Sequence, residues 1–284
     1  MRTQHWLVAL TIALCATACA EPVSTEQTAK DTAMPDTTQE SAGDNGHRYS
    51  SAPVEAMLGP HRFRFPANYY DDQIGPYVDG GIGITLLWPT LDAPAPGSRA
   101  QRTPQELQRQ VMVSIDYLDS APIATSLERL SSNDALSEPG SLERRDPRAR
   151  LDLRVAQPEQ GGLVPYTIDK PALDAWRAEY QQQMGAALPQ NPRFEQDWYV
   201  QRGSDAALST VIRCDSRAQS PDGLVVEGDD VHLTDSATVA SCTHYISDLP
   251  DSLSIRITYA RAFLGDWQKI EDHVRSLLKR YKVA

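Results

Sequence analysis

Histidines and cysteines are the residues of this chain whose chemistry is easiest to test against sequence spacing. Four of the six histidines fall in predicted strands or helices, and none has a neighbour at metal-ligand spacing. A general base also needs a second group that positions it. We keep one enzymatic hypothesis, in which His232 and His244 approach across adjacent strands. With Asp229 or Asp230 they would bind a metal or assist hydrolysis.

The common catalytic motifs are missing from the sequence. It has no GxSxG elbow, no HExxH, no P-loop lysine motif and no GxGxxG after a strand. The glycine run at 80–83 precedes a predicted strand, so it cannot present a helix N-terminus to a phosphate. We therefore predict a protein that is not an enzyme and has no cofactor and no metal site.

Acidic residues gather in two predicted loops, and tyrosines flank the first. Neither loop has the alternating oxygen ligands of a calcium-binding loop. Rigid aromatic side chains beside carboxylates suit contact with a basic protein surface, whereas solvated turns are the plainer alternative. The predicted contact residues are Tyr69, Tyr70, Asp71, Asp72, Tyr77, Asp79, Glu227, Asp229 and Asp230.

Two of the four cysteines, Cys214 and Cys242, lie well inside the chain. Their spacing is not CxxC, and two cysteines alone make a poor zinc site. In an oxidising compartment an isolated pair of this kind usually forms a structural disulfide. We predict a bridge between them.

The first residues have the order of a secretory signal peptide: a charge at Arg2, an apolar run over 6–14, and small residues before Cys19. The apolar run is too short to cross a bilayer. The stretch Ala16-Thr17-Ala18-Cys19 resembles the lipobox of bacterial lipoproteins, with Ala where Leu is commoner. The resemblance implies acyl chains on Cys19, and the following Ala20 implies sorting to the periplasmic face of the outer membrane. Ordinary cleavage after residue 18 or 20, which gives a soluble secreted protein, is the alternative.

Composition divides the chain into a signal peptide (1–18), a lipidated cysteine with a disordered acidic tether (19–55) and a folded periplasmic domain (56–284). Without the signal the chain has 26 basic and 38 acidic residues, a net charge of −12, of which 56–284 carry −7. This balance argues against nucleic acid or anionic lipid as a partner and mildly favours a basic protein surface.

Hydrophobic periodicity predicts an α+β domain, an antiparallel sheet meander with two amphipathic helices packed on it. The helices are expected at 171–184, with Asp169 capping the first turn, and at 266–281. The region 121–150 is expected to be a loop with one short helix. The expected strands are 61–66, 82–88, 111–118, 150–156, 163–168, 197–201, 209–215, 224–227, 230–233, 238–246 and 253–259.

Scattered segments are similar to periplasmic immunity lipoproteins that accompany type VI secretion effectors, including phospholipases. They are FRFPANY from Phe63, ITLLWP from Ile84, and CTH from Cys242 leading into the DWQKIE of the last helix. The resemblance implies a membrane-anchored binding protein that inhibits a toxic effector by occluding its active site. A structural or assembly lipoprotein of the cell envelope is the second hypothesis, and an envelope hydrolase is the third.

Overall fold

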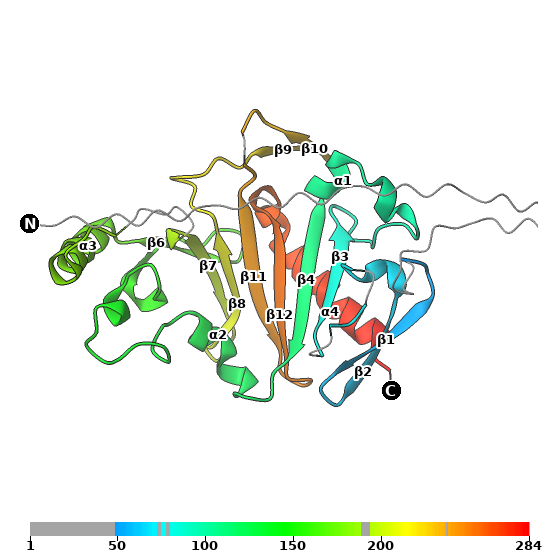
Figure 1. Ribbon diagram of the computed structural model, residues 1–284, viewed down its shortest axis with the longest axis horizontal. Helices are drawn as coiled ribbons and strands as arrows, with labels where there is room; N and C mark the ends of the chain where they lie inside the picture. The colour runs from blue at the N-terminus through cyan, green and yellow to red at the C-terminus, as the bar shows by residue number, and fades with distance from the viewer. Residues whose placement is uncertain (1–48, 73–74, 78–79, 189–193, 237, 284) are drawn as a thin grey trace, which may run out of the picture. The chain divides into compact units, whose positions relative to one another are not determined.

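An eight-stranded antiparallel sheet organises the folded part of the chain (Figure 1). The computed structural model describes residues 49–283, apart from 73–74, 78–79, 189–193 and 237. The strand order is β3-β4-β12-β11-β8-β7-β6-β5. The strands are β3 (Ile82–Leu87), β4 (Gln110–Tyr117), β5 (Arg154–Ala156), β6 (Val164–Ile168), β7 (Asp197–Arg202), β8 (Leu208–Cys214), β11 (Ser241–Asp248) and β12 (Leu253–Ala260). The predicted α+β class with an antiparallel sheet is confirmed.

One face of this sheet, called the inner face here, is covered by the helix α4 (Trp267–Tyr281), which runs behind the strands in Figure 1. The alternation of β4 explains why: Val111, Val113 and Ile115 are buried, whereas Met112 between them is 47% exposed. The apolar stripe of α4, including Ile270 and Val274, belongs to the same core cluster as the inward side chains of β4 and β12.

The opposite, outer face of the sheet is covered over the strands β6 to β8. The segment between β4 and β5 contains α2 (Ser126–Leu130), the short helix expected in this region, whose Leu127 packs with Trp198 and Val211. The helix α3 (Lys170–Met184) begins with the predicted cap, since Asp169 accepts a hydrogen bond from the Ala172 amide at 3.2 Å. Its Leu173 and Trp176 form a small separate cluster with Leu142 rather than covering the main sheet.

Two hairpins lie outside the main sheet. The first pairs β1 (Pro53–Leu58) with β2 (His61–Pro66), so the ordered fold starts at or before Pro53 and not at 56. Pro53 to Glu55 are assigned to the tether by their polar composition, but they pair with Arg64 to Pro66 of β2. The second hairpin pairs β9 (Leu224–Glu227) with β10 (Asp230–Leu233) and branches off instead of extending the meander.

The predicted disulfide joins the two central strands β8 and β11. Cys214 and Cys242 lie directly opposite each other in the register, with a Cα–Cα distance of 4.0 Å and an S–S bond of 2.00 Å. Both are fully buried on the inner face. Within the described residues, no helix combines the length and the apolar character needed to span a membrane.

Candidate functional site

The two histidines of the enzymatic hypothesis serve different parts of the fold. His244 is fully buried on β11, where its Nε2 lies 3.1 Å from Glu271 Oε2 of α4. His232 is exposed on β10, which pairs with β9 in the separate hairpin. Among the described residues, no group of three His, Cys, Asp or Glu side chains is arranged to hold a metal ion. The proposed hydrolytic pair is therefore not assembled.

His244 is instead part of a polar network between the sheet and α4. Glu271 accepts hydrogen bonds from Thr210 Oγ1 at 2.8 Å and from Arg275 Nε at 2.9 Å, and Tyr259 Oη lies 3.5 Å from His244 Nδ1. Burial lowers the pKa of His244. Burial acts to raise the pKa of Glu271, but His244, Arg275 and Thr210 outweigh it and the pKa is lowered. These two shifts favour a neutral imidazole on His244 beside a carboxylate on Glu271. The pair is therefore a structural link between β11 and α4.

The first acidic loop folds over β3 on the outer face. Tyr77 Oη donates to Asp71 Oδ2 at 2.6 Å, and the amide of Asp71 donates to the carbonyl of Gly83 at 2.9 Å. These side chains lie so close to β3 that a Cβ at Gly83 would overlap both of them. Burial, followed by the hydrogen bond to Asp71 and the charges of Asp72 and Asp116, raises the pKa of Tyr77. The loop and β4 together therefore place three carboxylates, those of Asp71, Asp72 and Asp116, around one tyrosine.

Asp116 is the member of this group that sequence reasoning missed. It lies on β4, and a Cβ built on Gly81 would be 2.5 Å from its Oδ1 and 3.1 Å from Tyr77 Cδ2. The available signal was strand alternation in the expected strand 111–118: the apolar side chains of Ile115 and Tyr117 fall on one side of such a strand, so the residue between them falls on the other. Asp79 falls outside the described residues.

The two other tyrosines of this loop point into the core. Tyr70 is fully buried, and its Oη donates to the carbonyl of Val54 at 3.2 Å. The ring of Tyr69 packs against Tyr281 and Phe65, with centroid distances of 5.4 and 6.1 Å. In this structure both residues fix the loop to the first hairpin, so a partner would meet Tyr77 and the carboxylates rather than these rings.

A single segment connects the two acidic loops. It contains a 3-10 turn (Ser98–Gln101) and the short helix α1 (Pro104–Gln108). Arg99 donates to the carbonyls of Tyr70 and Asp71, the latter at 2.6 Å, while Arg109 Nη2 donates to the Asp229 carbonyl at 2.8 Å. The second predicted loop is the β9–β10 turn, where Glu227, Asp229 and Asp230 are all exposed. The two loops thus share one support.

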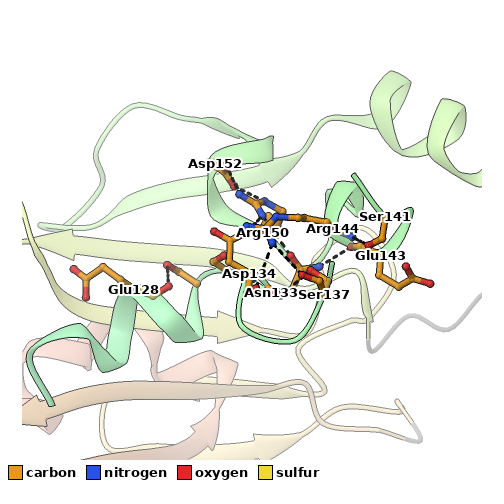
Figure 2. Close-up of polar contacts among 11 residues, drawn as sticks. Glu128, Asn133, Asp134, Ser137, Ser141, Glu143, Arg144, Arg150 and Asp152 are labelled. Atoms are coloured by element: carbon orange, nitrogen blue, oxygen red, sulfur yellow. Dashed lines mark hydrogen bonds and ion pairs between the residues drawn. The ribbon is translucent and has the colours of Figure 1, made fainter. Parts of the chain in front are cut away.

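A third charged region lies in the segment between β4 and β5 and consists of mutually paired side chains (Figure 2). Arg150 forms ion pairs with Asp134 and, at 2.8 Å, with Asp152, and Arg144 reaches Asp134 at 2.8 Å. Asn133 Nδ2 donates to the Glu143 carbonyl at 2.6 Å. Arg150 holds the pKa of Asp134 and of Asp152 below the usual range. These contacts order a long loop, and the arginines and carboxylates that form them are occupied with one another.

Comparison with known proteins gives one informative match. No protein-family model matches the sequence, and no curated protein matches it. A solved structure does: Smlt3025, an immunity protein of the Stenotrophomonas maltophilia type IV secretion system. It is 40% identical, with a TM-score of 0.78, over 87% of this chain and 100% of the matched chain. The resemblance to immunity proteins is confirmed, but this relative serves a type IV system, and the match does not support the type VI assignment.

Proposed function

This chain belongs to the family of the immunity protein Smlt3025, and we propose that it is itself an immunity protein that binds and neutralises a toxic effector of a bacterial type IV secretion system. The observation that carries the proposal is the 40% identity over the whole length of the relative. Inhibition is stoichiometric: the protein covers a functional surface of the toxin and performs no chemistry on it.

The geometry of the described residues supports binding rather than catalysis. The histidine best placed to act as a base, His244, is fully buried and hydrogen-bonded to Glu271. Carboxylates cluster instead at the β9–β10 turn, where all three are exposed, and around Tyr77, where Asp116 is exposed and Asp71 and Asp72 are half-buried. Complementary charge accelerates association and selects partners. A toxin with a basic surface around its active site is the partner these loops fit.

We further propose that the protein works as a lipoprotein of the outer membrane, facing the periplasm. The lipobox-like residues 16–19 support acylation of Cys19, and the polar stretch that follows supplies a tether. In a Cys19→Ser variant the protein should leave the membrane fraction. Retention of the variant with membranes, at the wild-type level, would remove the lipid anchor from the proposal.

The test of immunity is protection against the toxin encoded beside this gene. The toxin is exported to the periplasm of a sensitive strain, with or without this protein, and survival is counted. We expect full protection by the wild type and a one-to-one complex of the purified proteins. Failure to protect against any toxin encoded nearby overturns the proposal. Envelope weakness in a deletion strain without a competitor would favour the structural lipoprotein instead.

A further inference from the structure

A small groove lies between α1 and β10, next to the second acidic loop. Its volume is about 190 Å³, and its lining residues are Pro104, Gln105, Gln108, Val231, His232 and Leu233. Sites for small-molecule ligands usually have volumes of roughly 300 to 1,000 Å³. A groove of this size fits one protruding side chain better than a metabolite or a cofactor.

Exposed apolar side chains lie on the three elements around the groove, α1, β9 and β10. Leu233 is 54% exposed, and Leu107 on α1 is 50% exposed. Val225 is 44% exposed and lies directly opposite His232 in the β9–β10 register, so it adjoins the groove. Three of the eleven large hydrophobic side chains exposed in the described part of the chain thus fall on α1, β9 and β10. Exposed apolar clusters with a polar rim mark contact sites for proteins.

The rim of the groove is negatively charged. The β10 strand starts at Asp230, directly after Glu227-Gly228-Asp229, and these carboxylates are exposed. Arg109 is the cation that contacts this turn, at 3.3 Å from Asp230 Oδ1, and the Asp230 side chain is 76% exposed. Three exposed carboxylates, those of Glu227, Asp229 and Asp230, face this one guanidinium. The turn therefore keeps an excess of negative charge beside the apolar pocket.

We propose that this groove receives a single apolar side chain of the bound toxin, from a segment that carries Lys or Arg next to it. The inference rests on the proposed immunity function and assigns it a contact site. The apolar side chain fills the space between Gln108 and Leu233, while the neighbouring cation lies against the acidic turn. A buried apolar anchor beside a charged rim is the arrangement in which a few residues dominate affinity.

The test measures binding of the purified toxin, encoded beside this gene, to the full exported chain by titration calorimetry. Leu233→Glu places a charge in the groove and should weaken binding about 30-fold or more, the range of a dominant contact residue. In stopped-flow mixing of the same two proteins, Asp229→Lys should slow association several-fold at low salt. The matched controls are Leu136→Glu, at a side chain that is 91% exposed, and Glu159→Lys, also exposed. All four variants should keep the wild-type thermal midpoint.

A second measurement locates the contact without substitutions. Hydrogen exchange of 104–108 and 230–233 should slow when the toxin is added. Two results would refute the groove as a contact site while leaving the immunity function intact. One is equal affinity of Leu233→Glu, Leu136→Glu and the wild type for the toxin, and the other is unchanged hydrogen exchange in both segments. A wild-type protein that binds no neighbouring toxin overturns both. If the protein without toxin forms a dimer and Leu233→Glu dissociates that dimer, the groove binds a second copy of this chain. This result would also refute the groove as a contact site for the toxin.

Discussion

The buried carboxylate of Glu271 offers the sharpest test of how α4 is held to the sheet. Its Oε2 accepts from Thr210 and His244, which are both fully buried, and its Oε1 accepts from Arg275, whose side chain is 31% exposed. Replacement by Leu removes every acceptor and leaves two buried donors without partners. Each unsatisfied buried donor costs about 1 to 3 kcal/mol. We therefore expect Glu271→Leu to lower the free energy of unfolding by about 3 to 5 kcal/mol, the usual cost of breaking a buried pair.

Glu271→Gln separates shape from charge at the same position. The amide oxygen can keep accepting from the buried side, while the amide nitrogen faces Arg275, which solvent still reaches. The expected loss is therefore smaller, about 1 to 3 kcal/mol. The matched control is Asp272→Asn on the exposed side of α4, which should change stability by less than about 0.5 kcal/mol. Urea denaturation at pH 7 measures all three variants. Equal stability of Glu271→Leu and Asp272→Asn would refute the network as a structural link.

Three further predictions follow from the geometry. Stability should fall on acidification below about pH 6.5, the ordinary pKa of a histidine, because the pKa of His244 is lowered in the folded state and the unfolded chain takes up the proton first. Glu271 should add a second decline below about pH 4.5, the ordinary pKa of a glutamate, because its pKa is also lowered in the folded state. In urea titrations from pH 8 to 3, a missing first slope would contradict the shift of His244 and a missing second slope that of Glu271. Reduction of the Cys214–Cys242 disulfide should lower the free energy of unfolding by about 3 to 4 kcal/mol, because a bridge between cysteines 28 residues apart restricts the unfolded chain. An unchanged melting temperature after reduction would contradict this prediction. Gly83→Ala should displace Tyr77 and Asp71 above β3 and loosen the first acidic loop. The measurement is faster hydrogen exchange of the Asp71 and Tyr77 amides, which donate to carbonyls of Gly83 and Gly81, whereas Gly265→Ala, with open space around its Cβ, should leave those amides unchanged.

The local elements were predictable because their causes are local. In β4 and β12 every second side chain is buried, and the sequence shows the same alternation of apolar and polar residues. The cap of α3 at Asp169 and the apolar stripe of α4 depend on residues three or four positions apart. The disulfide needed only a count of cysteines and an oxidising compartment.

The pairing of distant segments was not predictable from the same signals. The strand β12 pairs with β4 as well as with β11, although more than a hundred residues separate it from β4. Periodicity says which side chains point inward but not which strand lies alongside. The same gap explains why the enzymatic hypothesis looked for the partner of His244 on a neighbouring strand: its actual partner, Glu271, comes from a helix on the inner face. The position of Asp116 next to the first acidic loop likewise depends on the pairing of β4 with β3, which strand periodicity does not predict.

Rigidity of the scaffold connects these internal contacts to the proposed inhibition. Binding requires that loops be ordered, and ordering them during association reduces affinity. Here the disulfide links β8 to β11, the Glu271 network fixes α4, and arginines 99 and 109 tie the segment 98–109 to both acidic loops before any partner arrives. A pre-ordered acidic surface also associates quickly with a basic one, since complementary charge raises the rate of encounter. An inhibitor of the kind proposed above benefits from both effects, so substitutions that loosen the scaffold should weaken protection even where they leave the contact residues unchanged.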